Sequence, residues 1–231
     1  MKAAVMTPRL LSAAEFVRRG AVFADVGTDH AYLPIFLLEE GMISRAVCSD
    51  INRGPLLNAE NNAKERGLFS KMEFILTDGA AALSGHGITD LAICGMGGEL
   101  IADIIEGAPF LRSADLHLIL QPMTKQDVLR RYLASRGFKI SREKYTVEGR
   151  HNYVTMLAEY VGEPYEISDL EAEIGLPPYL LSENPERLSY VLEKTRALEK
   201  AVRGKELGGK DISLDKELLN LMKNLTRGKD L

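Results

Sequence analysis

The chain has few cysteines, no long apolar segment and no excess of basic residues. Cys48 and Cys94 lie in separate apolar runs, and no Cys-x-x-Cys pair offers zinc ligands. We therefore expect free thiols in a reducing compartment and no metal site. No segment approaches the roughly 18 consecutive apolar residues of a membrane span, and the first residues lack the apolar core of a secretory signal. These absences predict a cytoplasmic protein that does not enter a membrane.

The whole-chain charge does not favour a nucleic-acid partner, but the charge is unevenly spread. The 231 residues contain 29 Lys and Arg against 33 Asp and Glu, a net charge of −4. Residues 125–150 are locally basic, with a net charge of +5, whereas residues 161–231 have a net charge of −3. Basic runs are often solvated helix faces, so the cluster alone does not identify an RNA-binding surface.

Short apolar runs alternate with helical segments along the first two thirds of the chain. Strands are expected at 21–26, 45–49, 71–76, 90–94 and 116–120, and helices between them include 30–40, 55–66 and 126–136. This alternation favours a parallel sheet covered by helices on both faces. Two more strands, 138–147 and 153–160, are separated by too few residues for a crossover helix, so they should pair antiparallel. The pattern indicates an α/β fold with the Rossmann-like seven-stranded sheet of class I methyltransferases.

The composition changes after Glu163-Pro164, and we divide the chain into a methyltransferase domain (1–162) and a C-terminal helical segment (163–231). Asn184-Pro185 predicts the start of one helix, and Ser213 can cap a second. Their apolar residues step by three and four, as in a coiled coil. The first stripe is Leu188, Val191, Thr195, Leu198 and Val202, and the second is Leu214, Leu218, Leu221 and Leu225. The segment is either an antiparallel, coiled-coil-like hairpin, suited to self-association, or two helices packed back on the sheet.

Acidic and glycine residues gather at the ends of the expected strands, where ligands bind in open parallel sheets. Asp50 follows Asp25 by 25 residues, a spacing at which a carboxylate accepts both ribose hydroxyls. Asp78 can accept from the exocyclic amine of adenine, with Ile51 against its ring. Each feature alone is an ordinary turn, but together they predict a nucleoside-cofactor site. Its candidate residues are Asp25, Gly27, Thr28, Asp29, His30, Asp50, Ile51, Asp78, Gly79, Gly95, Met96 and Gly97.

The first turn decides between the nucleoside cofactors. A dinucleotide site requires glycines at positions that Asp29 and Tyr32 occupy here, and the Asp29 carboxylate would repel a diphosphate. S-adenosyl-L-methionine has no phosphate and carries an ammonium and a sulfonium, which acidic neighbours favour. The local charge therefore predicts S-adenosyl-L-methionine as the cofactor.

Several motifs resemble those of the TrmK family, the bacterial tRNA (adenine(22)-N(1))-methyltransferases. They are Asp25-Val-Gly-Thr-Asp-His-Ala-Tyr-Leu-Pro34, Gly95-Met-Gly-Gly98, Gln121-Pro122 and Glu148-Gly-Arg-His-Asn-Tyr153. The resemblance covers almost the whole chain and implies methyl transfer from S-adenosyl-L-methionine to N1 of an adenine in tRNA. The family commonly has Ser at Thr28, and Asn at Met123. Thr28 keeps the hydroxyl, whereas Met123 removes an amide near the expected target base.

Given this resemblance, Asp29 is the first candidate catalytic residue. The N1 atom of neutral adenine has a free lone pair, and positive charge develops on the ring as it is alkylated. A nearby carboxylate stabilises that charge. His30 is the second candidate, as an orienting or proton-relaying partner. Both side chains can instead serve only the methionine end of the cofactor. The class I signature for amine methylation, [DN]-P-P-[FY], is absent.

A tRNA substrate requires positive charge near the site. The candidate RNA contacts are Arg9, Lys125, Arg130, Arg131, Arg136 and Lys139. Two other functions stay open from the residues: a methyltransferase acting on another RNA or a small metabolite, and a catalytically silent scaffold that binds the cofactor.

Overall fold

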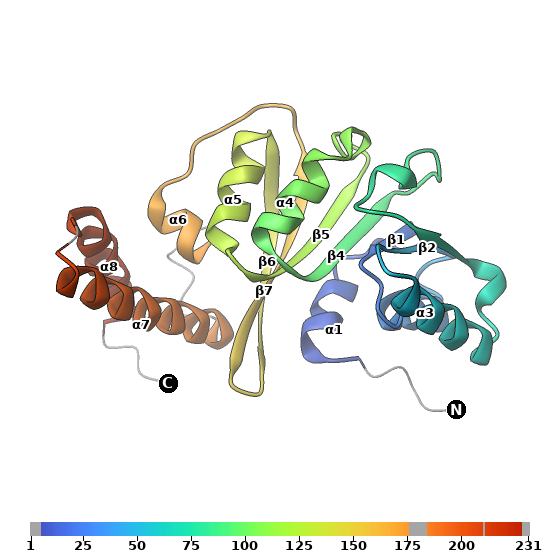
Figure 1. Ribbon diagram of the computed structural model, residues 1–231, viewed down its shortest axis with the longest axis horizontal. Coiled ribbons are helices and arrows are strands. Elements are labelled where there is room, and N and C mark those ends of the chain that lie inside the picture. Colours follow the sequence, from blue (N-terminus) through green and yellow to red (C-terminus); the bar gives the residue numbers. More distant parts are fainter. Residues whose placement is uncertain (1–5, 176–183, 210, 228–231) are drawn as a thin grey trace.

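The computed structural model describes residues 6–175, 184–209 and 211–227, so the first five residues of the expected methyltransferase domain and residues 176–183, 210 and 228–231 of the expected C-terminal segment lie outside it. Its single sheet has seven strands in the order β3-β2-β1-β4-β5-β7-β6 (Figure 1). The first five are parallel, and β7 is antiparallel to both neighbours. The predicted fold class and the terminal antiparallel pair are confirmed. The strands are β1 (Val22–Val26), β2 (Arg45–Asp50), β3 (Met72–Leu76), β4 (Asp90–Gly97), β5 (His117–Thr124), β6 (Phe138–Glu148) and β7 (His151–Tyr160).

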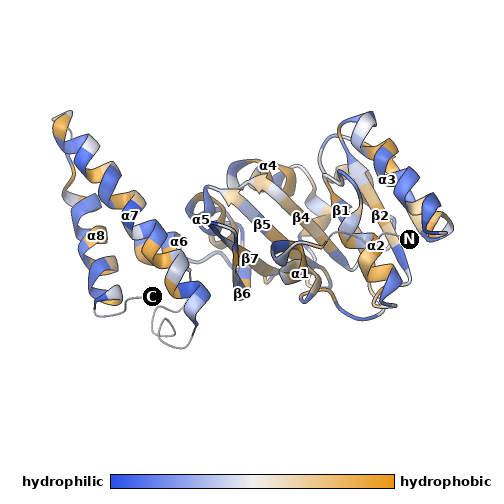
Figure 2. Cartoon of the chain, turned by 90° about the horizontal axis from the view of Figure 1, so that it is seen from below, coloured by the Kyte–Doolittle hydropathy of each residue, from blue (hydrophilic) through white to orange (hydrophobic). Residues whose placement is uncertain are grey.

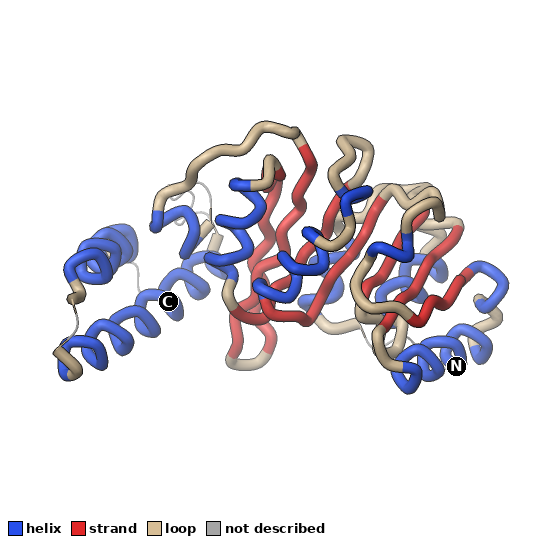
Figure 3. The backbone as a smooth tube through the Cα atoms, turned by 45° about the horizontal axis from the view of Figure 1, so that its top comes forward, coloured by secondary structure: helices blue, strands red, loops and turns tan. Residues whose placement is uncertain are grey.

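Helices cover both faces of the sheet (Figure 3). The period of two along each strand sends successive side chains to opposite sides. In β4, Leu91 and Ile93 join the core beneath α4 (Gly98–Glu106) and α5 (Gln126–Ser135). Ala92 joins the other core, beneath the three N-terminal helices. The central strands β1, β2, β4 and β5 are accordingly apolar along most of their length (Figure 2). The N-terminal helices are α1 (Pro8–Ala14), α2 (Tyr32–Glu39) and α3 (Arg53–Glu65), and short 3-10 turns span Phe69–Lys71, Ala81–Leu83 and Pro109–Leu111.

The largest boundary difference that concerns the site is the start of α2. The sequence predicts a helix from His30, but Ala31 has a left-handed φ of 54°, and the helix begins only at Tyr32. A left-handed residue cannot continue a right-handed helix. Asp29 and His30 are therefore loop residues at the edge of the sheet.

The C-terminal segment forms three described helices, α6 (Asp169–Ile174), α7 (Pro185–Leu207) and α8 (Ser213–Thr226). α7 and α8 pack together as a pair and α7 also contacts β6 and β7, so both proposed arrangements hold in part. Tyr190, Val191 and Met222 are buried in the core that the sheet contributes. Leu214 and Leu221 were expected on the apolar face of α8, and this is wrong, since both side chains are exposed. Met222 is buried in the core in their place. None of the described helices is both long and apolar enough to cross a membrane.

A buried ion pair connects α5 to β6 and α6. Arg130 is 2% exposed, and its Nε lies 2.8 Å from a carboxylate oxygen of Glu143. Its Nη1 donates to the carbonyl oxygens of Ala172 (2.7 Å) and Glu173 (3.3 Å) in α6. The expectation that Arg130 binds RNA is wrong, because every contact it makes faces the interior.

We expect Arg130→Ala to lower the free energy of unfolding by about 3–5 kcal/mol, since it leaves the Glu143 carboxylate buried without its partner. Urea denaturation followed by circular dichroism measures the change. The matched control is Arg131→Ala, which removes a surface pair with Asp169 and should cost less than about 1 kcal/mol. Equal stability of the two variants would contradict the structural role of Arg130.

Candidate active site

A cavity of about 510 Å³ opens where the first and fourth strands end. Its wall comes from the start of α1, the loop between β1 and α2, and the end of β4. Five residues that the sequence predicts for the cofactor site line it: Asp25, Gly27, Asp29, His30 and Gly95. The structure thus brings the first and fourth strand ends together around one space.

The turn after β1 is fixed by hydrogen bonds to the neighbouring strand. The backbone amides of Gly27 and Thr28 both donate to the Ser49 carbonyl oxygen, at 2.8 and 2.9 Å. Gly27 has a φ of +78°, and a Cβ there would lie 2.1 Å from Cε of Met96. Glycine satisfies both the left-handed backbone and the close approach. Met96, a predicted cofactor residue, therefore packs beside this turn.

Asp25 is a buried carboxyl at the base of the cavity. Its side chain accepts a 2.5 Å hydrogen bond from the Thr28 hydroxyl, so Thr28 acts behind the cavity wall. Burial raises the pKa of Asp25 to about 6, the Thr28 hydrogen bond lowers it in part, and the Asp50 charge raises it further. Burial also raises the pKa values of the Cys48 and Cys94 thiols, and both cysteines are free. The negative charge of the Asp25 carboxylate, which the Thr28 hydrogen bond stabilises only in part, therefore favours a cationic group of a ligand at this position.

Asp29 and His30 lie at the open side of the cavity. The Asp29 side chain is 70% exposed, and its carboxylate lies 3.4 Å from Nε2 of His30. The His30 ring stacks on the Tyr32 ring with 5.1 Å between centroids. The His30 carbonyl oxygen accepts a 3.0 Å hydrogen bond from the Asn62 side chain of α3. The loop is thus held from α2 and α3, while the Asp29 carboxylate remains accessible.

Arg9 faces these acids from α1. Its Nη1 donates to Oε1 of Gln121 at 3.2 Å, and the same oxygen accepts from the Gly95 backbone amide at 3.1 Å. Gln121 is fully buried and therefore fixes both the guanidinium and the left-handed turn at Gly95. The Arg9 backbone amide lies 3.4 Å from a carboxylate oxygen of Glu148. Arg9 also lines the cavity, and its predicted contact with RNA stays a prediction.

The other predicted cofactor residues lie along the same sheet edge, outside the cavity lining. The Asp50 carbonyl accepts from the Thr77 amide at 3.0 Å, which holds the ends of β2 and β3 together. The Asp50 carboxylate accepts from the Asn52 amide at 2.7 Å, and the neighbouring Ile51 is 60% exposed. Asp78 and Gly79 follow directly after this junction. Ile51 is thus an exposed apolar side chain at the edge where β2 and β3 end, and its place against an adenine ring stays a prediction.

The turns after β4 and β5 pack closely. A Cβ on Gly98 would lie 2.1 Å from the Lys125 carbonyl oxygen, and one on Gly97 would lie 3.3 Å from the Thr124 hydroxyl. Lys125 is exposed at this edge of the sheet, in a left-handed conformation. It is the one candidate RNA contact outside the cavity that lies on the cofactor side.

Two other candidate RNA contacts, Lys139 and Arg136, lie toward the opposite edge of the sheet, whereas Arg131 is exposed and pairs with Asp169. Lys139 pairs across the sheet with Glu159, which is level with His117 at the start of β5. It therefore lies at the opposite edge. Arg136 follows α5 toward that edge and pairs with Glu106 at 3.1 Å. Several basic side chains of residues 125–150 are thus paired with acidic side chains that lie far away in the sequence.

Six residues that line the cavity are not among the site residues predicted from the sequence: Thr7, Leu10, Ala31, Tyr32, Leu33 and Cys94. Ala31, Tyr32 and Leu33 lie within the motif that runs from Asp25 to Pro34. Their position directly after the predicted site residue His30 could have identified them. Thr7 and Leu10 come from the start of α1, whose place against the end of β1 no local pattern reveals.

The comparisons with known proteins agree with this geometry. Residues 6–156 match the family model described as a methyltransferase domain. The tRNA (adenine(22)-N(1))-methyltransferase of Bacillus subtilis is 32% identical over 181 residues, which cover 77% of this chain and 76% of the relative. The chain belongs to the TrmK family.

Solved TrmK-family structures share nearly the whole architecture. The crystal structure of the B. subtilis TrmK is 26% identical, with a TM-score of 0.78 over 95% of this chain and 94% of that one. A Streptococcus pneumoniae protein solved in complex with S-adenosyl-L-methionine is 31% identical, with a TM-score of 0.82 over 96% of this chain and 99% of that one. The C-terminal helices are therefore part of what the TrmK relatives share.

We expect the buried Asp25 carboxylate to destabilise the fold at neutral pH. Its pKa is raised on folding, from 3.8 to about 6, so the folded state holds the proton more tightly. Between these two pH values the folded protein keeps the proton and the unfolded chain releases it. The stability that proton binding by Asp25 contributes is therefore lost as the pH rises. Asp25→Asn should match the native protein near pH 3.5 and be more stable by about 3 kcal/mol at pH 7. Urea denaturation at several pH values measures the difference, and a difference that does not vary with pH contradicts the burial argument.

Proposed function

We propose that this protein transfers a methyl group from S-adenosyl-L-methionine to N1 of the adenine at position 22 of tRNA. The single observation that supports this most strongly is the 32% identity with the B. subtilis enzyme of that name. The S. pneumoniae relative, solved with S-adenosyl-L-methionine, supports the choice of cofactor.

The residues around the cavity fit that cofactor. Its amino-acid part carries both charges, and the cavity offers the carboxyls of Asp25 and Asp29 opposite the guanidinium of Arg9. Asp50 and Asp78, with the exposed Ile51 at the same edge of the sheet, suit the ribose and the adenine ring. When bound, S-adenosyl-L-methionine supplies a methyl group made electrophilic by its sulfonium.

The chain's residues then have to receive and stabilise the acceptor. Neutral adenine attacks through its N1 lone pair, so no residue must first remove a proton. The ring gains positive charge during transfer, and the Asp29 carboxylate at the cavity mouth is placed to stabilise it. His30, 3.4 Å away, orients that carboxylate. Entry of an RNA base also removes water from Asp29, which strengthens the attraction.

The remaining assignments are consistent with a tRNA enzyme of the cytoplasm. Lys125 and the exposed Arg150, at the tip of the β6–β7 hairpin, provide positive charge at the cofactor edge. The free thiols of Cys48 and Cys94 suit a reducing compartment. Leu207 and Leu214 are exposed where α7 ends and α8 begins. We assign self-association of the protein to the surface around these two side chains.

Incubation of the protein with unmodified tRNA transcripts and methyl-labelled S-adenosyl-L-methionine should place the label on the adenine at position 22. Mapping by primer extension and nucleoside mass spectrometry identifies the position, and a transcript with guanine in place of that adenine is the control. Label on a different nucleotide would replace the substrate assignment. Cofactor binding with no transfer to any tRNA would favour the silent scaffold, and transfer only to a small metabolite would favour the other enzyme.

Asp29 and Asp50 should differ in the step they affect. Asp29→Asn removes the charge beside the acceptor and should lower kcat by about 100-fold, in the range of other electrostatic stabilisers. Asp50→Ala should chiefly weaken cofactor binding, since it removes the expected ribose contact. Single-turnover rates at saturating cofactor and calorimetric titration with S-adenosylhomocysteine separate the two. Native single-turnover rates for Asp29→Asn would restrict that residue to cofactor binding.

A further inference from the structure

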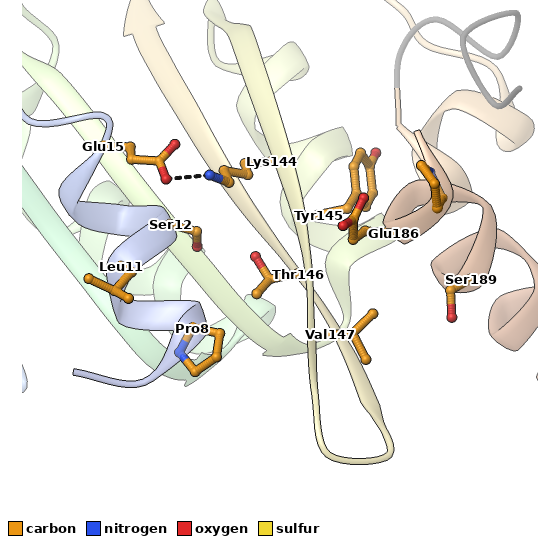
Figure 4. Close-up of a pocket in the computed structure, with 11 residues that line it drawn as sticks. Pro8, Leu11, Ser12, Glu15, Lys144, Tyr145, Thr146, Val147, Glu186 and Ser189 are labelled. Atoms are coloured by element: carbon orange, nitrogen blue, oxygen red, sulfur yellow. Dashed lines mark hydrogen bonds and ion pairs between the residues drawn. The ribbon is translucent and has the colours of Figure 1, made fainter. Parts of the chain in front are cut away.

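α7 belongs to the C-terminal segment, yet it makes polar contacts near the sheet edge where the cofactor cavity opens. A second cavity, of about 530 Å³, separates α1 from the start of α7, with the β6–β7 hairpin between them (Figure 4). Beyond that start, two neighbouring residues of α7 contact the sheet domain. Glu193 accepts a hydrogen bond from the side chain of Asn152 in the β6–β7 hairpin, and Lys194 donates to the side chain of Gln126, the first residue of α5.

Lys194 is a half-buried cation that already has two polar partners. Its side chain is 19% exposed, and its Nζ lies 2.9 Å from Oε1 of Gln126 and 3.4 Å from a carboxylate oxygen of Glu173. Nζ also lies 5.7 Å from the centroid of the Tyr190 ring. The bond to Gln126 is charge-assisted, and such bonds are about twice as strong as bonds between neutral groups. These contacts favour a role for Lys194 inside the protein over a contact with a phosphate.

Gln126 extends this contact to the end of β5. Because its Oε1 accepts from Lys194, its amide nitrogen faces the carbonyl oxygen of Pro122, which lies 3.3 Å away. A cation at the oxygen of an amide polarises the group and strengthens the donation from its nitrogen. The register of β4 and β5 shifts on both sides of Met96, the residue that pairs with Pro122. Side-chain amides, and not a regular ladder alone, therefore hold the backbone at this point.

Gln121 connects the same carbonyl group with the cofactor cavity. Its Nε2 lies 3.5 Å from the Pro122 carbonyl oxygen, the longest contact in the series. Its Oε1 accepts from Nη1 of Arg9 at 3.2 Å and from the Gly95 amide at 3.1 Å. Nε2 and Oε1 belong to one planar amide, so a shift of the carbonyl moves the oxygen atom that holds the guanidinium. A continuous series of hydrogen bonds thus runs from Lys194 to Arg9.

We propose that Lys194 is a positioning residue of the cofactor cavity. It fixes the Gln126 amide, which holds the Pro122 carbonyl and, through it, the Gln121 amide. The result is an Arg9 guanidinium held at the cavity, where it is available to the carboxylate of the cofactor's amino-acid part. This inference rests on the proposed function and extends it, because it makes α7 a support of the cofactor site.

Calorimetric titration with S-adenosylhomocysteine tests the inference. Lys194→Met keeps the length of the side chain but removes its charge and its donor, and it should weaken Kd about five-fold, as for one lost hydrogen bond. Lys194→Arg keeps a cationic donor and should restore Kd to within about two-fold of the native value. Gln126→Glu keeps an acceptor for Lys194 but loses the donor to Pro122, so it should weaken binding at least as much as Lys194→Met.

A double-mutant cycle separates positioning from a general loss of stability. Arg9→Met alone should weaken Kd by about 20-fold, as for a lost charged hydrogen bond. In that background Lys194→Met should have no further effect, because the group through which it acts is gone. Additive effects of the two substitutions, or native affinity of the Arg9→Met variant, would overturn the inference.

The matched control is Lys223→Met, which removes a lysine that pairs with Glu199 at 2.7 Å on the same pair of helices. It should leave Kd for S-adenosylhomocysteine at the native value, and an effect equal to that of Lys194→Met would assign the change to loosening of the helices. The melting temperature of each variant is measured beside its Kd, so that all titrations are made on folded protein.

Filter retention of tRNA at several salt concentrations tests whether Lys194 contacts a phosphate instead. The slope of log Kd against log salt concentration should be native for Lys194→Met, and a slope shallower by about one would contradict the inference. If the native protein binds S-adenosylhomocysteine but methylates no tRNA, the proposed function fails. The double-mutant cycle still decides the role of Lys194 in that case, because it needs no tRNA.

Discussion

The placement of a carboxyl group, Asp25, inside the end of the first strand is the constraint on which the active site depends. Burial of an ionised carboxylate is unfavourable, and the fold compensates with one short hydrogen bond from Thr28. That bond requires the chain to turn back at Gly27, and the turn is held because two backbone amides share the Ser49 carbonyl of β2. The parallel pairing of β1 and β2 therefore determines where the charge lies, and the charge determines which ligand group can enter.

α1 is the second element on which the site depends, although it contains only seven residues. It comes from the start of the chain and packs against β5, β6 and β7, strands that are formed more than 100 residues later. Through Arg9 it supplies a positive charge to the cavity that Asp25 and Asp29, at the end of the first strand, also line. Gln121 fixes that guanidinium and the Gly95 turn with a single oxygen atom. The cavity is thus assembled from long-range contacts around a motif that is local in sequence.

Sequence reasoning succeeded where a residue's role depends on near neighbours. The order of strands and helices, the antiparallel β6–β7 pair and the grouping of Asp25, Gly27, Asp29, His30 and Gly95 all follow from local periodicity and strand ends. It failed where the partner comes from elsewhere in the chain. Arg130 resembled its exposed neighbour Arg131, yet Glu143 and the carbonyls of α6 bury it. The place of Arg9 in the cavity was not predicted either, because nothing nearby in the sequence shows that Gln121 holds the guanidinium there.

The distribution of charge also explains how an acidic protein can act on a polyanion. Asp25 and Asp29 line the cavity. Other acids pair with basic side chains on the surface: Glu106 with Arg112 and Arg136, Asp169 with Arg131, and Glu15 with Lys144. Three basic residues of the segment 125–150, Arg131, Arg136 and Lys144, are paired in this way with acids from elsewhere in the chain. We therefore expect fewer side chains to attract tRNA than the local charge of +5 suggests. A surface with few phosphate contacts gains less from counterion release and needs uncharged contacts for its affinity.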